Sequence, residues 1–254
     1  AMSAVMRSID PVVQVSGGTC YGFDFKNGKY DFSSYREVLQ LFREMYSTGV
    51  AFPGSESLDI DPLRTQFAAG NIAFYFSLSH AEPGVYQSQF PTDINWNCCQ
   101  IPSLSGNTDG VQNLWFGGSD KAINASTKHP DEAWKVMEFL HSDEVMGPYY
   151  TAGLGTVMIK SAVEGAEPPV SIETMPDLAI GSNDQNWPIR PSISIEGEDY
   201  STVAVQCIFG LKDIDQAISE LNDRYNNAYD KLVADGAKRI IYPNFTAKNQ
   251  DTSV

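Results

Sequence analysis

The run NIAFYFSLS, residues 71–79, strongly constrains the fold because nearly every position in it is apolar. A strand that is apolar on both faces must be covered on both faces, which is typical of a sheet packed between helices. The residues before it, DPLRTQFAAG, predict a short helix with Asp61 as N-cap and Pro62 at the first helical position. A second run, WNCCQI at residues 96–101, predicts another strand that ends at Pro102.

Helical periodicity accounts for much of the remaining sequence. Apolar residues at helical spacing predict a helix over residues 33–47, which Gly49 ends. Residues 130–140 predict another, with Pro130 in the first position and Asp131 and Glu132 in the first turn, where the helix dipole favours acids. Two closing helices are expected within residues 200–210 and 213–236. Helices that alternate with strands, without internal repeats, predict an α/β fold.

The charge balance excludes some classes of partner. The chain has 17 basic and 32 acidic residues and a formal net charge of -15. A surface this negative repels phosphate backbones and anionic membranes, so nucleic acid is excluded as a partner. No run of 18 apolar residues is present, so no segment is expected to span a membrane.

The histidines and cysteines do not predict a metal site. His129 and His141 lie twelve residues apart in the segment of the predicted 130–140 helix, which separates them by about 18 Å along a helix axis. They cannot share a metal, and the chain has no CxxC pair for zinc. Cys98 and Cys99 are adjacent in a predicted strand, so their side chains should point to opposite faces and not form a disulfide. No cofactor is expected, although the oxygen-rich loop SLDIDP could hold calcium.

Several motifs follow one another along the chain. They are GGTCYGFDFKNGKYDF before a helix, the pattern F..G..A before a strand, GG...AI, KHPDEAWKVMEFLHSDE with a later YY..GLG, and the closing DIDQAISELNDRYNNAYDK. Together they resemble the extracellular solute-binding proteins of ABC importers, in the sugar-binding, maltose-binding-protein-like group. The resemblance extends from about Val12 to Leu232. Each motif alone is loose, but the order and spacing of the set make the resemblance fairly specific.

The resemblance implies a periplasmic-binding-protein-like fold of type II, in which two α/β lobes close around a ligand. The resemblance further implies that this chain would begin inside the second lobe and lack most of the first, N-terminal lobe. Residues 1–104 and 153–254 are therefore expected to form the second, C-terminal lobe. Residues 105–152 would supply the hinge crossing and a partial segment of the first lobe.

The function implied by the resemblance is capture of a sugar or oligosaccharide and its delivery to an ABC permease. The protein would be a monomer, extracellular or periplasmic, and a membrane-anchored lipoprotein in its full-length form. It would not be an enzyme. Two alternatives stay open at this point, a secreted carbohydrate hydrolase and a surface adhesion module. The hydrolase could use paired carboxylates from Asp59 and Asp61 or from Glu196, Glu198 and Asp199, although such clusters are expected by chance among 32 acids.

A sugar site needs aromatic planes beside hydrogen-bonding groups, and the predicted loops offer both. His80 follows the strand over residues 71–77, where family members place a cleft aromatic, and Glu82 and Tyr86 lie near it in the sequence. Trp115 precedes Gly117 and Gly118 at the predicted lobe crossing.

Further candidates lie near the ends of the chain. Trp187 and Arg190 occupy a polar, proline-flanked loop, where packing alone does not explain a tryptophan. Tyr200 begins a helix that resembles the one carrying a cleft aromatic in the family, and Arg7 matches a cleft position on the first helix. Trp96 and Trp134 are instead predicted to lie in the core.

Overall fold

A computed structural model describes residues 4–17, 19–76, 82–99, 101–106, 121–155, 157, 159–168, 187–247 and 251–253. The chain divides into two compact units. The first contains Ala1–Leu63, Gln100–Trp115 and Gly181–Val254, and the second contains Arg64–Cys99 and Phe116–Ile180. These boundaries do not coincide with the predicted lobe boundaries, so the lobe division stays a prediction.

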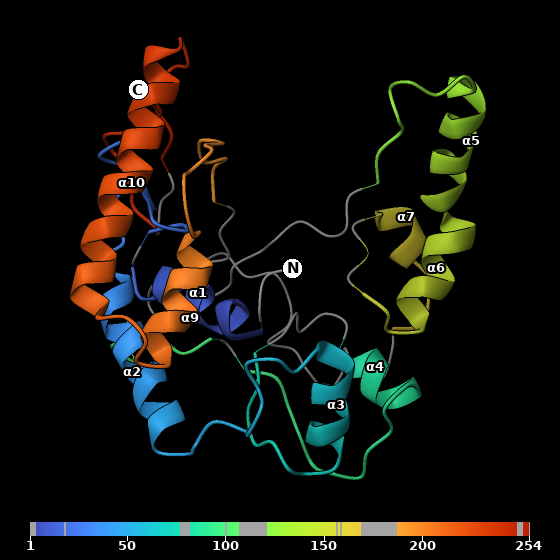
Figure 1. Cartoon of the computed structure of the whole chain (residues 1–254). Helices are drawn as coiled ribbons and strands as arrows, with labels where there is room; N and C mark the ends of the chain where they lie inside the picture. The colour runs from blue at the N-terminus through green and yellow to red at the C-terminus, as the bar shows by residue number, and fades with distance from the viewer. Residues whose placement is uncertain are drawn as a thin grey trace. The chain divides into compact units, whose positions relative to one another are not determined.

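Helices dominate the described residues (Figure 1). They are α1 (Ala4–Val15), α2 (Tyr35–Ser47), α3 (Ile60–Ala68), α4 (Glu82–Ser88), α5 (Pro130–Leu140), α6 (Asp143–Thr151), α7 (Lys160–Val163), α9 (Tyr200–Ile208) and α10 (Ile214–Ala234). The long closing helices start at aspartate caps. Asp199 accepts from the backbone N–H of Thr202, and Asp213 accepts from that of Gln216. Such caps satisfy N–H groups that a helix leaves unpaired at its start.

A short antiparallel hairpin follows α1. Its strands β1 (Phe23–Asp24) and β2 (Lys29–Tyr30) pair Phe23 with Tyr30. Cys20 and Phe23 exchange both backbone hydrogen bonds across Tyr21 and Gly22. These two residues have φ of 51° and 80°, the combination required by a two-residue type I′ turn.

In the first unit α2 packs against α1, α9 and α10, and α10 also packs against β2 of the hairpin. Figure 1 shows α9 beside α10. Asn226 of α10 holds β2 like a neighbouring strand, because its Oδ1 accepts from the Tyr30 N–H at 2.8 Å and its Nδ2 donates to the Tyr30 carbonyl at 2.7 Å. The core between these elements is rich in buried aromatic side chains, including Phe23, Tyr30, Phe32, Tyr35, Tyr225 and Tyr229.

The second unit contains α4 to α7 and most of α3. Helix α6 packs against both α5 and α7. The predicted burial of Trp134 is wrong, since this side chain on α5 is 57% exposed. Trp96 is half-buried and meets the rings of Phe67 and Tyr86 edge-on or tilted.

The structure confirms the predicted helices over residues 33–47, 130–140 and 213–236 to within a few residues. It contradicts the predicted strands over the described parts of residues 71–79 and 96–101, which form no regular element. A strand needs a partner strand for its backbone groups, and no ladder reaches these described segments. Helix α4 also replaces part of a predicted loop, with Pro83 in its first turn, where proline is tolerated. Within the described residues, the structure consists of helices and one two-stranded sheet, so the α/β fold class stays a prediction.

None of the helices in the described ranges is both long enough and apolar enough to cross a membrane.

Candidate functional site

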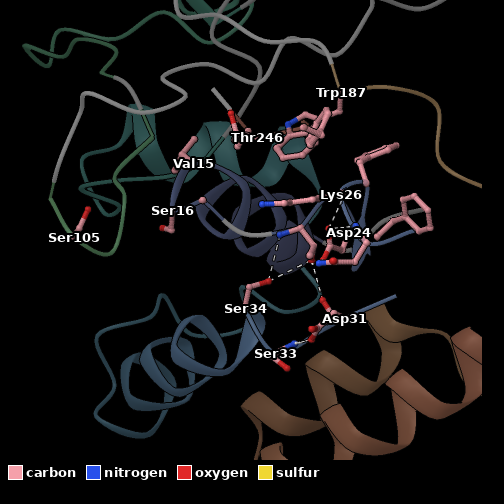
Figure 2. Close-up of a pocket in the computed structure, with 17 residues that line it drawn as sticks. Val15, Ser16, Asp24, Lys26, Asp31, Ser33, Ser34, Ser105, Trp187 and Thr246 are labelled. Carbon is pink, nitrogen blue, oxygen red and sulfur yellow. Dashed lines mark hydrogen bonds between the residues drawn. The ribbon is translucent and has the colours of Figure 1, made fainter. Parts of the chain in front are cut away.

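A pocket of about 620 Å³ lies on the first unit and combines aromatic with polar side chains (Figure 2). Its aromatic lining comes from the buried residues Phe23, Phe25 and Phe245 and from the half-buried Trp187. Thr19, Lys26, Asn27, Ser33 and Ser34 contribute polar groups. Segments distant in the sequence thus meet at one pocket, because the hairpin, the start of α2, the 187 loop and the C-terminal segment all border it.

Of the predicted site residues that the structure describes, Trp187 lines this pocket. Its ring stacks on Phe25, with centroids 6.2 Å apart and an interplanar angle of 29°, and lies 5.8 Å from the Phe245 ring. The indole Nε1 is buried and has no acceptor among the described residues. A buried donor without an acceptor costs about 1–3 kcal/mol, so a ligand oxygen that accepted from it would recover that energy.

Asp24 and Asp31, the two acids in the pocket wall, stabilise backbone turns by accepting hydrogen bonds. The Oδ1 of Asp24 accepts from the N–H groups of Lys26 and Asn27 at 2.9 and 3.1 Å, and its Oδ2 accepts from the Asn27 amide at 2.6 Å. The Oδ1 of Asp31 accepts from the Ser33 N–H at 2.9 Å. The Lys26 ammonium forms no ion pair with a described residue. The wall therefore offers mainly hydroxyl, amide and ammonium groups to a ligand.

A second polar group in the first unit centres on Asp10 of α1. Its carboxylate is buried and accepts from the Tyr35 hydroxyl at 2.6 Å and from the Tyr200 hydroxyl at 2.9 Å. Burial raises the pKa of Asp10 to about 6, although both tyrosines and the nearby charge of Arg190 act in the opposite direction. Tyr200 begins α9 as predicted, and it is buried with its hydroxyl bound to Asp10.

Arg190 connects to this group through Tyr21. Its Cζ is 4.6 Å from the centroid of the Tyr21 ring, and Tyr21 meets Tyr200 edge-on with centroids 6.4 Å apart. Sequence reasoning identified Arg190 and Tyr200 but missed Tyr21 and Asp10. The Tyr-Gly pair between Cys20 and Phe23 was a usable signal for Tyr21, since glycine in a two-residue turn predicts a hairpin. Nothing in the sequence marked Asp10 as buried.

Glu82 and Tyr86 lie together on α4 in the second unit, where their described contacts are with protein groups. Arg64 binds the Glu82 carboxylate through two nitrogens at 3.0 and 2.7 Å, and the Tyr75 hydroxyl donates to it at 2.6 Å. The Tyr86 hydroxyl lies 2.9 Å from that of Tyr75. His80 and Trp115 fall outside the described residues, and Arg7 lies in α1 with its side chain outside them.

The carboxylate cluster considered for hydrolysis is used structurally. Hydrogen bonds from Lys212 and Gln206 lower the pKa of Glu198, and the Thr202 N–H lowers that of Asp199, which caps α9. A general acid needs a raised pKa, so these two shifts run in the wrong direction for that role. The described residues contain no group of three side chains suited to a metal ion, and their four cysteines are free.

Comparison with known families gives one match. The family model described as bacterial extracellular solute-binding protein matches residues 9–147, which is more than half of the 254 residues. The matched range includes Asp10 and the hairpin with Tyr21, and it ends inside α6. Proteins of this family bind a solute outside the cytoplasm and are generally not enzymes. The chain belongs to the bacterial extracellular solute-binding protein family.

Proposed function

We propose that this chain captures a sugar or oligosaccharide as the substrate-binding component of an ABC importer and delivers it to the permease. The observation that carries the proposal is the pocket around Trp187, considered together with family membership. A pyranose presents apolar C–H faces and a rim of hydroxyls. The half-buried Trp187 ring suits such a face, and the hydroxyl and amide groups of Thr19, Asn27 and Ser33 suit the rim.

The proposal also includes the oligomeric state, the location, the two-lobed fold and the contact residues that the family resemblance implies. The protein acts as a monomer, extracellular or periplasmic, and is anchored as a lipoprotein in its full-length form. Its solute is enclosed between two type II lobes of the periplasmic-binding-protein kind. Arg7, His80, Glu82, Tyr86, Trp115, Trp187, Arg190 and Tyr200 are the residues proposed to contact it.

Calorimetric titration with a panel of monosaccharides and oligosaccharides tests the function and identifies the sugar. Substitution Trp187→Ala should weaken binding about tenfold or more, because it removes a stacking plane. Trp187→Phe keeps an aromatic plane but not the Nε1–H donor, so its affinity should lie between those of the wild type and the alanine variant. Circular dichroism of each variant checks that the fold is retained.

Trp134→Ala is the matched control, since it removes an exposed tryptophan of the second unit that does not line the pocket. Its affinity should equal that of the wild type. Failure to bind any sugar in the panel would refute the proposed function. Binding that survived Trp187→Ala unchanged would assign Trp187 to the scaffold and leave the function intact.

A further inference from the structure

Arg190 is an exposed arginine whose guanidinium contacts an aromatic ring. Its guanidinium lies over the Tyr21 ring, with Cζ 4.6 Å from the centroid. A guanidinium in this position is attracted to the negative face of the ring, and its planar group can still present N–H edges to a ligand. Arg190 also hydrogen-bonds with the Tyr30 hydroxyl, so the ring contact and this bond together orient the guanidinium, whose remaining N–H groups can bind an acid.

The ring beneath Arg190 is itself fixed in place. Tyr21 occupies a left-handed backbone conformation, φ 51°, which is uncommon for a residue other than glycine. The backbone hydrogen bonds between Cys20 and Phe23 hold that turn, and Tyr200 supports the ring from its side. Tyr200 is fixed in turn by Asp10. The platform for the guanidinium is thus preorganised.

No carboxylate in the described part of the chain forms an ion pair with Arg190. The described ion pairs use Lys29, Arg36, Arg64, Lys160, Lys212 and Arg239. The charge of Arg190 lowers the pKa of Asp10, but only as the smallest of the effects there, and both Asp10 oxygens accept from tyrosine hydroxyls. Within the described residues Arg190 therefore has no acid partner, and its oriented guanidinium is available to an acid supplied by a ligand.

We propose that Arg190 binds a carboxylate of the solute, so that this protein selects a sugar acid over the corresponding neutral sugar. The inference rests on the proposed function and adds the chemical class of the solute. A guanidinium fork matches a planar carboxylate with two parallel hydrogen bonds, and the positive charge strengthens both of them. Trp187 and Arg190 are three positions apart in the sequence, so their Cα atoms are separated by roughly 11 Å at most. Both side chains can therefore contact the same ligand.

The experiment compares D-glucuronate, D-galacturonate and their oligomers with glucose, galactose and the matched neutral oligomers, by calorimetry. The wild type should bind the acidic member of a pair about tenfold more tightly or better. Arg190→Gln should lose this preference, because its affinity for the acidic sugar should fall much further than its affinity for the neutral one. Arg190→Lys keeps the charge but not the fork, so part of the preference should remain.

Arg36→Gln is the control for total charge, since Arg36 is an exposed arginine of the same unit, paired with Asp215. This variant should show the wild-type preference. Tighter binding of the neutral sugars, or an acid preference that persists in Arg190→Gln, would overturn the inference and leave the sugar-binding function standing. Absence of binding to every acidic and neutral sugar would overturn both. Thermal melting of the variants confirms that each is folded.

Discussion

At the scale of single residues, Asp10 couples the stability of the first unit to pH. Burial raises its pKa from 3.8 to about 6 in the folded chain, so the folded state binds this proton more tightly than the unfolded state does. The stabilisation from protonation is complete below the unfolded pKa and is lost as the pH rises through about 6. The groups around the carboxyl are Tyr35 and Tyr200, which donate to it, Arg190, whose charge lowers its pKa, and Cys20, whose own pKa the Asp10 charge raises.

Asp10→Asn should remove this part of the pH dependence. A shift of roughly two pKa units corresponds to about 3 kcal/mol. The free energy of unfolding of the wild type, relative to the Asn variant, should therefore fall by up to that amount between about pH 4 and pH 7.5. Denaturant unfolding at several pH values measures it. Asp223→Asn, at an exposed position on α10, is the control and should follow the wild type. A difference between Asp10→Asn and the wild type that stayed constant with pH would contradict the argument.

At the scale of elements, the Cys20–Phe23 turn, which carries Tyr21 and precedes β1, depends on Gly22 for two reasons. Gly22 has φ of 80°, where a side chain strains the backbone, and an added Cβ would overlap the buried Phe32 ring. Gly49, which follows α2, shares the first property with φ of 74°, but an added Cβ there meets nothing within 4 Å. The two positions separate backbone strain from steric overlap.

Gly22→Ala should destabilise the chain by about 2–4 kcal/mol, since overlap in a packed core adds to the cost of the left-handed backbone. Gly49→Ala should cost about 1–2 kcal/mol, the backbone part alone. Chemical denaturation of both variants gives the comparison. Equal losses would mean that the Phe32 ring moves aside readily and that the turn is less rigid than the Arg190 platform requires.

At the scale of the whole molecule, the net charge of -15 opposes compaction through self-repulsion. Raising the salt concentration from 0.01 to 0.15 M shortens the screening length from about 30 to about 8 Å. The melting temperature at pH 7 should therefore rise with sodium chloride over this range. The rise should vanish near pH 4.4, the sequence pI, where the net charge is zero. A melting temperature that fell with salt at pH 7 would show that attractive ion pairs outweigh the repulsion.

The sequence by itself determined the helices well. The hydrogen bonds of a helix join residues four apart, so periodicity and caps within one segment predicted α2, α5 and α10. Family motifs are also local strings, and they led to the family that the later match established. Of the candidate site, the sequence could indicate Trp187 and Arg190, because both stand out from their polar loop.

Tertiary structure decided the properties that need a distant partner. The apolar run at residues 71–76 forms no strand, since no neighbouring strand pairs with it among the described residues. Trp134 has an apolar helix position but is 57% exposed, because no described segment covers it. Strand β2, in contrast, is held by Asn226, 196 residues further along the chain. Asp10, Tyr21, Arg190 and Tyr200 come together for the same reason. Their contacts depend on how α1, the hairpin and α9 pack, and no local pattern encodes that packing.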